Sequence, residues 1–432
     1  MDDSQNAPDA TVAAALRAAV AARGIASSAQ LQAALGKSQP TVSRLLAGLG
    51  AELVVVGRGR RTGYALPRPI LGAGGRQPLH WVHEDGRIER WGSLSFLGGE
   101  RTHLEAPGIS QLAQGTLPWC LAPLRGEGFL GRLLAQRLTA QGLDRDPARW
   151  PLEHVLFAAL QASDAPGALV LGEPRDVPAP VGSYDELADD VAKNLPAGSS
   201  AGGEQAKFLS RRADGTAVLV KFTPPRGTPF GERWHDLLHA EALALEVLGE
   251  HGVAVAQARV VETPRRSYLE STRFDRVGSG GRRHAVPLWA AHEAFVAGPK
   301  MSWTATCEAL AGQRRVPQEA LAQVAALRHF GRLIGNSDMH FGNLSLFAAQ
   351  ADVALGRFTL APVYDMLPMR WRPDASTGAL DLLAFTPETI DLQSPARAVA
   401  EVFWRRAAEH AALGKGFRAL ARTMLARVGA GS

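Results

Sequence analysis

Hydrophobic residues recur at helical spacing in the first part of the chain. The first of them are four residues apart, at Val12, Leu16 and Val20. This spacing predicts a helix that ends near Gly24. Ser27 or Ser28 can cap a second helix, and Gly36 can end it. Two short helices are therefore expected before residue 37.

A third helix is expected to begin at Ser38-Gln39-Pro40, because proline is favoured in the first helical turn. Its apolar residues recur at i, i+3, i+4 and i+7 and must face the core: Val42, Leu45, Leu46 and Leu49. Its outward positions are polar or basic: Gln39, Thr41, Ser43 and Arg44. A polar helix that follows a tight glycine turn is typical of a helix-turn-helix that reads the DNA major groove.

A hairpin with a basic tip is expected directly after the third helix. Residues 53–56 and 63–66 predict its strands, and the glycine-rich tip carries Arg58, Arg60 and Arg61. These guanidinium groups are placed to meet DNA phosphates. Residues 1–66 are therefore predicted to be a winged helix-turn-helix domain that binds double-stranded DNA. The alternative is a generic three-helix interaction module.

The next part of the chain shows no candidate chemistry. Residues 67–79 are rich in proline and glycine and are predicted to be a linker. Residues 80–182 begin with short strands and continue with helices from about residue 117. We expect this region to be a subdomain whose residues serve packing.

The last region, residues 183–432, begins with a predicted hairpin. Its strands are residues 208–211 and 217–221, and Gly202 and Gly203 precede them. Glycines let backbone N–H groups approach phosphate oxygens that a Cβ would obstruct. A nucleotide-binding loop is therefore expected in front of the hairpin.

Lys221 ends the second strand of this hairpin. It would neutralise the α- and β-phosphates of a nucleotide, as the strand lysine of kinases does. A helix that begins near residue 233 carries Glu241, whose carboxylate is suited to orient Lys221. Glu246 lies on the same helix, so the choice between the two stays open.

A polar loop interrupts the apolar residues between positions 327 and 347. Asp338 is placed to accept a hydroxyl proton, and Asn343, five residues later, to hold a divalent ion against phosphates. Asp365 follows about 20 residues downstream and offers a carboxylate to the same ion. His340 is expected to form hydrogen bonds within the loop rather than to act as a base.

Three segments resemble the HipA-like toxin kinases, which are bacterial serine/threonine kinases. In chain order they match a phosphate loop, a hinge, and a catalytic loop with its metal aspartate: Ser200-x-x-Gly203-x-Gln205-x-Lys207, Arg273-Phe274-Asp275-Arg276, and Asn336-x-Asp338-x-His340-x-x-Asn343 followed by Tyr364-Asp365. The resemblance covers roughly residues 80–420. The fused amino-terminal helices make the chain most similar to the YjjJ-type members.

The resemblance implies ATP and Mg²⁺ as cofactors and a protein serine or threonine as substrate. It also implies autophosphorylation at Ser200, with Ser199 as the adjacent alternative. The known targets of the family are aminoacyl-tRNA synthetases. The remaining implied contacts are phosphate-loop contacts by Gln205 and Lys207, and adenine contacts by the backbone of Thr272 and Phe274.

Composition narrows the class of protein. Of 432 residues, 46% are hydrophobic and 21% charged, which is typical of a globular chain. We recognise no signal peptide and no apolar run of about 18 residues, so we expect a cytoplasmic protein without a membrane partner. Cys120 and Cys307 are too few for a cysteine-built zinc site, and we recognise no H-E-x-x-H or similar spacing among the histidines. The net charge of +5 permits nucleic-acid contact.

We therefore predict an α+β protein with a two-lobed, protein-kinase-like fold of the HipA-like class and an amino-terminal winged helix-turn-helix domain. The predicted activity is ATP-dependent phosphorylation of a protein, within a toxin–antitoxin module that regulates itself through DNA binding. The alternative is a DNA-binding regulator whose kinase fold binds nucleotide without transferring phosphate, or a toxin that acts directly on DNA. Winged helices commonly bind two-fold sites, so a homodimer is compatible with this prediction.

Overall fold

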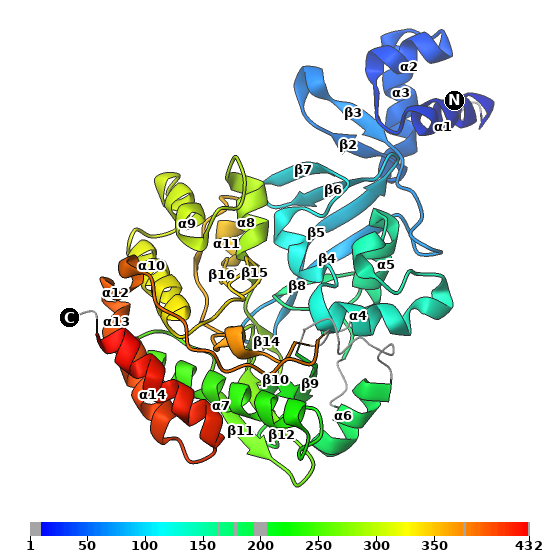
Figure 1. Ribbon diagram of the computed structural model, residues 1–432. Coiled ribbons are helices and arrows are strands. Elements are labelled where there is room, and N and C mark those ends of the chain that lie inside the picture. The colour runs from blue at the N-terminus through cyan, green and yellow to red at the C-terminus, as the bar shows by residue number, and fades with distance from the viewer. Residues whose placement is uncertain (1–9, 163, 177–179, 194–204, 375–376, 431–432) are drawn as a thin grey trace.

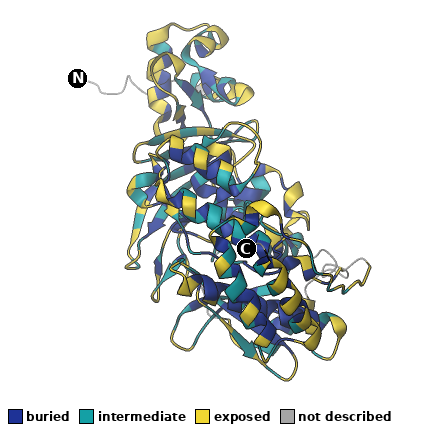
Figure 2. Cartoon of the chain, turned by 60° about the vertical axis from the view of Figure 1, so that its left-hand side comes forward, coloured by how far each residue is buried: buried dark blue, intermediate teal, exposed yellow. Residues whose placement is uncertain are grey.

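The computed structural model of the protein describes residues 10–162, 164–176, 180–193, 205–374 and 377–430. A small amino-terminal unit, a middle domain and a larger carboxyl-terminal region follow one another along the chain (Figure 1). Figure 2 shows the amino-terminal unit at one end of the molecule, with buried residues gathered inside each part.

The amino-terminal unit combines helices with short strands: α1 (Ala10–Arg23), β1 (Ala26–Ser27), α2 (Ser28–Leu35), α3 (Gln39–Leu49), β2 (Val54–Val56) and β3 (Gly63–Ala65). Strand β3 lies between β1 and β2 and is antiparallel to both. Ser27 caps α2 reciprocally, because its Oγ accepts from the Gln30 amide and its own amide donates to the Gln30 side chain. Gly36 ends α2 with a φ of 62°. These local signals place the helices where the sequence predicts them.

The middle domain is an antiparallel sheet in the order β7-β6-β5-β4-β8, with helices packed beside it. Its elements are β4 (Arg76–Val82), β5 (Ile88–Leu97), β6 (Arg101–Ala106), β7 (Ile109–Gln114), α4 (Gly128–Arg137), α5 (Leu152–Gln161) and β8 (Leu169–Leu171). Figure 1 shows α4 and α5 together at one side of this sheet.

The predicted linker is shorter than its composition indicates. Residues 76–79 already belong to β4, and Leu79 is fully buried, because its side chain packs in the core between the sheet and the helices. Arg76 also ties the sheet to the amino-terminal unit, since its guanidinium donates to the carbonyls of Ala51 (3.1 Å) and Leu53 (2.7 Å). The boundary between the two units is therefore a packed one.

The carboxyl-terminal region opens with a second antiparallel sheet in the order β11-β12-β10-β9. Its elements are α6 (Tyr184–Lys193), β9 (Lys207–Arg211), β10 (Ala217–Phe222), α7 (Pro229–Glu250), β11 (Ala258–Glu262) and β12 (Ser267–Thr272). The long helix α7 packs against β11 and β12 and buries the side of the helix that carries Glu241.

Short strands and helices complete the region: β13 (Arg276–Val277), β14 (Gly281–Arg282), β15 (Ala285–Pro287), α8 (Leu288–Phe295), α9 (Trp303–Gly312), α10 (Glu319–Leu333), β16 (Ser345–Phe347), α11 (Gln350–Val353), β17 (Thr359–Leu360), α12 (Thr389–Leu392), α13 (Ala396–Glu409) and α14 (Lys415–Gly429). Trp371 anchors this part, because its ring packs near those of Trp404 and Phe417. One continuous apolar core joins the helices to the middle domain. Within the described ranges, we find no helix with the length and hydropathy needed to cross a bilayer.

Candidate active site

A buried lysine lies between two carboxylates at the centre of the carboxyl-terminal region. The Nζ of Lys221 donates to both carboxylate oxygens of Glu241, at 2.7 Å each, and to the carboxylate of Asp365. The side chain of Lys221 is only 4% exposed and that of Glu241 only 1%. Glu246 instead pairs with Arg406 on α13, so the structure selects Glu241 as the partner of Lys221.

Burial and charge compete in this triad. Burial alone would lower the pKa of Lys221, but Asp365 and Glu241 outweigh it and raise the pKa. Burial likewise favours the protonated form of Asp365, yet Lys221 and then Lys207 hold its pKa down at about 2. For Glu241, burial dominates and its pKa is raised. Asp365 is therefore ionised at neutral pH, as a carboxyl group that binds a cation must be.

The polar loop begins where α10 ends. Gly335, with a φ of 78°, turns the chain against the Trp371 ring, and the Asn336 side chain then donates to the Asp365 carbonyl at 3.3 Å and accepts from the Asp338 amide at 3.0 Å. The Asn343 side chain donates to the Asp338 carbonyl at 2.7 Å. These bonds hold Asp338 in a fixed loop, and they leave the Oδ1 of Asn343 as the oxygen that can face an ion.

His340 and Tyr364 complete the loop. The Nδ1 of His340 accepts from the Gly342 amide at 3.0 Å, which is a structural hydrogen bond within the loop. Tyr364 donates to the Gly342 carbonyl at 2.6 Å and so connects the loop to the segment that carries Asp365. Asp365 itself has a φ of 53°, which is uncommon for a residue other than glycine. The structure therefore brings Lys221, Glu241, Asp338, Asn343 and Asp365 together.

The phosphate-loop residues are placed only in part. Gln205 donates to the Phe222 carbonyl at 2.9 Å, and Lys207 lies opposite Lys221 in the β9–β10 register. Both residues thus lie beside the buried lysine. The other predicted residues of this loop lie outside the described part of the chain: Ser199, Ser200, Gly202 and Gly203.

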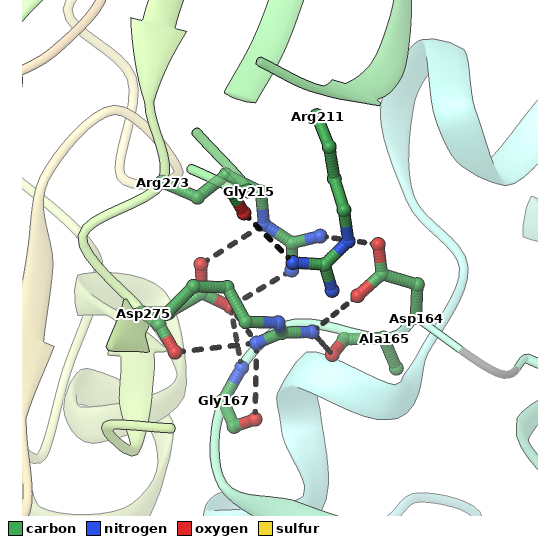
Figure 3. Close-up of polar contacts among 8 residues, drawn as sticks. Asp164, Ala165, Gly167, Arg211, Gly215, Arg273 and Asp275 are labelled. Carbon is green, nitrogen blue, oxygen red and sulfur yellow. Dashed lines mark hydrogen bonds and ion pairs between the residues drawn. The ribbon is translucent and has the colours of Figure 1, made fainter. Parts of the chain in front are cut away.

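Charged side chains fix the hinge segment against the middle domain (Figure 3). Arg273 donates to both oxygens of Asp275, at 3.0 and 2.9 Å, and to Asp164 at 2.6 Å. Arg276 donates to the same two aspartates. Burial would raise the pKa of Asp275, but the two arginines outweigh burial and hold this pKa well below its usual range. Two arginines and two aspartates therefore form a network of ion pairs that holds the hinge segment in place.

Phe274 lies apart from this network, since its ring centroid is 5.4 Å from that of Tyr364, next to Asp365. The Thr272 amide donates to the Gln257 carbonyl at 2.8 Å. An adenine contact by the Thr272 backbone is therefore restricted to its carbonyl oxygen, because its N–H is used inside the protein.

The residues present fit a magnesium nucleotide. Buried polar atoms without a hydrogen-bond partner among the described residues include Gln205 Oε1 beside Lys221 and Thr272 Oγ1 at the hinge. Native proteins rarely leave such atoms unsatisfied unless a ligand or water serves them. Asn343 and Asp365 offer the oxygen ligands that Mg²⁺ prefers.

The predicted DNA-contacting residues lie on the surface of the amino-terminal unit. Gln39, Ser43, Arg44, Arg58, Arg60 and Arg61 are exposed, and Thr41 is half-buried, with its hydroxyl 3.0 Å from Ser38. Gln39 donates to Ser43 at 3.2 Å. For the four arginine side chains, we find no ion pair with another described residue. Their charges are thus available to an anionic partner.

Sequence reasoning missed three features of the region. It did not pair Lys221 with Asp365, and it did not involve Asp164 in the hinge. The prediction that the histidines show no metal-type spacing is wrong, because His235 and His239 lie one helical turn apart on α7 and near Glu262. The i, i+4 spacing of this pair is visible in the sequence and was the available signal.

Known proteins match this chain over most of its length. Residues 199–430 match the family described as "HipA-like C-terminal domain", and residues 73–176 match "YjjJ-like toxin, middle domain". A curated protein of Escherichia coli K12, "Toxin YjjJ", is 34% identical over 427 residues, covering 93% of this chain and 94% of that protein.

Solved structures are also similar. A structure of HipA from Shewanella oneidensis MR-1, described as a complex with HipB and its operator DNA, is 18% identical with a TM-score of 0.54 and covers 82% of this chain and 96% of that chain. This likeness shows a shared α+β fold. A Helicobacter pylori kinase, CtkA, covers 52% of this chain and 88% of its own, at 13% identity and a TM-score of 0.36.

Proposed function

Because the chain belongs to the HipA-like toxin kinase family and resembles its YjjJ-type members, we propose that it is an ATP-dependent kinase that phosphorylates a protein serine or threonine. The observation that carries this proposal is the buried contact of Lys221 with Glu241 and Asp365, beside a loop that presents Asp338 and Asn343. Each of these groups has a role in phosphoryl transfer.

The roles follow from the chemistry of each side chain. Lys221, oriented by Glu241, would bind the α- and β-phosphates, and Asn343 with Asp365 would hold the magnesium ion. A bound Mg-ATP supplies the phosphoryl group and the charge that polarises it. Asp338 would accept the proton of the acceptor hydroxyl. Gln205 and Lys207 would contact the phosphates, and Phe274 the adenine.

Autophosphorylation offers the sharpest test of this activity. The full chain is incubated with Mg-ATP and its intact mass is measured, beside an Asp338→Asn variant and a Glu308→Gln control on the exposed side of α9. We expect one added phosphate on Ser200 or Ser199 in the wild type and the control, and none in Asp338→Asn. A wild-type chain that starts unmodified, binds ATP and gains no phosphate contradicts the proposal.

The proposed acceptor in other proteins is a serine or threonine of an aminoacyl-tRNA synthetase, the target class of the family. Labelled phosphate from ATP, followed by mass spectrometry of the labelled proteins of a host extract, would identify it. Labelling by the wild type that is equal to labelling by Asp338→Asn would exclude phosphorylation by this chain.

We also propose that the amino-terminal unit is a winged helix-turn-helix that binds double-stranded DNA. The supporting observation is the exposed polar face of α3 beside the unpaired arginines of the β2–β3 hairpin tip. One chain would then combine the DNA-binding and kinase halves of a toxin–antitoxin module. Dimerisation on a two-fold site is part of this proposal.

The salt dependence of binding tests the DNA contacts. The plot of log K against log salt concentration has a negative slope, and each lost phosphate contact makes this slope less steep by about 0.9. Alanine at Arg58, Arg60 or Arg61 should therefore reduce the slope for a duplex from the gene's own promoter. Arg17→Ala is the matched control, because Arg17 already pairs with Glu52 in the same unit. An unchanged slope in all three hairpin variants contradicts the proposed contact.

The second candidate function is a DNA-binding regulator that retains nucleotide binding without phosphoryl transfer. The same hairpin arginines favour it, and so does the direct contact of Lys221 with Asp365, which must be exchanged before the carboxylate can hold an ion. DNA binding that responds to ATP, in a chain that gains no phosphate, would select this function. A toxin that acts directly on DNA would instead cut the duplex in the presence of Mg²⁺.

A further inference from the structure

Histidines from separate elements gather with a carboxylate where α7 meets β11 and the segment after α13. His235 and His239 lie one turn apart on α7, Glu262 ends β11, and His410 follows α13. Figure 1 shows α7 between β11 and the helices α13 and α14. These residues are separate from the triad of Lys221, of which only Glu241, two positions after His239, lies on α7.

The donor atoms of this cluster are close to one another. His239 Nε2 is 2.9 Å from Glu262 Oε1, and His235 Nδ1 is 3.8 Å from the same oxygen. One ligand atom from each of the three residues lies within 4.8 Å of the other two. Ligands of a zinc ion, each about 2 Å from the metal, lie roughly 3 to 3.5 Å apart. A metal would therefore draw the most widely separated of these atoms together by about 1 to 1.5 Å.

The hydrogen bonds of His235 fix its tautomer. Its Nε2 is 2.9 Å from the Ala412 carbonyl, which can only accept, so Nε2 carries the proton. The lone pair is then on Nδ1, which lies 3.8 Å from Glu262 and accepts from the Ser267 hydroxyl at 2.7 Å, so this hydroxyl must turn away before Nδ1 can bind a metal. A histidine that donates one nitrogen to a backbone carbonyl and offers the other is the usual arrangement at metal sites.

His410 supplies a second, independent observation. Its ring centroid is 5.3 Å from that of His239, and its Nδ1 is buried without a hydrogen-bond partner among the described residues. His410 is not one of the three residues whose ligand atoms lie within 4.8 Å of one another, so its ring would have to turn toward them to serve as a fourth ligand.

We propose that His235, His239 and Glu262 form a binding site for a divalent cation of the zinc class, with His410 as the fourth ligand. Imidazole nitrogen suits zinc, copper or nickel, whereas magnesium takes oxygen ligands. The site therefore differs in metal preference from the oxygen ligands Asn343 and Asp365.

The site would also restrain α7. His235 and His239 precede Glu241 on that helix, and Asp236 already accepts from the Gly414 amide at 2.7 Å. A metal would thus tie α7 to β11 and to the segment after α13, and so steady the Glu241 contact with Lys221. This consequence rests on the proposed kinase function, whereas metal binding itself does not.

Cobalt(II) is the probe for the test, because nitrogen ligands in a four-coordinate site give it strong visible absorption bands. The full chain is titrated with Co²⁺ and then with Zn²⁺, in millimolar Mg²⁺. The variants are His239→Gln, Glu262→Gln and Asp365→Asn, with His251→Gln as a control at the end of the same helix. Circular dichroism of the metal-free proteins checks that each variant folds.

We expect one Co²⁺ per chain, displaced by Zn²⁺, in the wild type, His251→Gln and Asp365→Asn. Affinity should fall at least tenfold in His239→Gln and in Glu262→Gln. Absence of the band in the wild type overturns the proposal. So does a band that survives unchanged in both folded ligand variants, or one that is lost in Asp365→Asn, because the ion would then lie elsewhere. Autophosphorylation, measured separately, reports on the kinase function alone.

Discussion

Removing the cation of the triad should destabilise the protein strongly. In a Lys221→Met variant, Glu241 and Asp365 lose the ammonium group that holds them, which lies 2.7 Å from the Glu241 oxygens. At an effective dielectric constant near 20, one such contact corresponds to about 6 kcal/mol of Coulomb energy. The desolvation of Lys221 that the variant no longer requires offsets part of this. Broken buried pairs typically cost 3–5 kcal/mol, so we expect a loss of about 4 kcal/mol at pH 8.

The loss should depend on pH in a defined direction. In the wild type, the pKa of Asp365 is lowered to about 2, so its contribution is present above the unfolded pKa and disappears as the pH falls toward 2. In the variant, Lys207 is the main charge left to oppose burial, so we expect the pKa of Asp365 to rise above its unfolded value and the pKa of Glu241, already raised in the wild type, to rise further. The unpaired carboxylates then destabilise the protein most at high pH. This loss of stability decreases as the pH falls through their raised pKa values. At about 1.4 kcal/mol per pKa unit, the difference from the wild type should shrink by at least ~1 kcal/mol between pH 8 and pH 5.

Urea unfolding followed by tryptophan fluorescence measures this difference, because Trp371 and Trp404 are buried in the same region. Lys415→Met is the matched control, since Lys415 is exposed at the start of α14 and its charge is not part of the triad. It should cost less than about 1 kcal/mol. The electrostatic explanation fails if the Lys221→Met loss is the same at both pH values, or if it equals that of the control.

Three further substitutions test local features of the fold, two near the site and one in the amino-terminal unit. Gly335→Ala should lower the free energy of unfolding in urea by about 3 kcal/mol, because φ is 78° and a Cβ would lie 2.7 Å from the Trp371 ring. Gly312→Ala is the control and should cost far less, because a Cβ there meets nothing within 4 Å. Arg273→Met should cost about 3–5 kcal/mol, since it leaves buried Asp275 short of a partner, and a loss below 1 kcal/mol would contradict the hinge network. Ser27→Ala should cost about 1 kcal/mol in thermal unfolding and leave autophosphorylation unchanged; a change in autophosphorylation would show that the cap acts beyond its own helix.

Features that depend on residues close together in the chain were predictable from the sequence. The capping pair of Ser27 and Gln30, the left-handed Gly36 and the apolar face of α3 act over a few positions, and they set the helix bounds. The loop with Asp338 and Asn343 was found for the same reason, because its spacing is local. These elements agree closely between sequence and structure.

Features that depend on distant residues were not predictable. Lys221 and Asp365 are 144 positions apart, and Arg273 lies 109 positions from Asp164. The choice of Glu241 over Glu246 depends on which side of α7 packs on the sheet, and both sides carry apolar residues. The linker predicted for residues 67–79 is too long, because its proline and glycine content alone indicated its extent. The burial of Leu79 depends instead on helices that are distant in sequence and cover the sheet.

The two carboxylates that contact Lys221 are not equivalent, and the difference has a mechanistic meaning. Glu241 is 1% exposed and binds Nζ through both oxygens, while Asp365 is 24% exposed, has a left-handed φ and is joined to the polar loop of Asp338 and Asn343 through Asn336. An ion that reaches the site can therefore approach Asp365 but not Glu241. In the proposed kinase, Asp365 would release Lys221 to hold the ion, and Glu241 would still hold Nζ in place toward the phosphates. A single buried carboxylate could not do both, so the two carboxylates fit the two roles that the proposal assigns them.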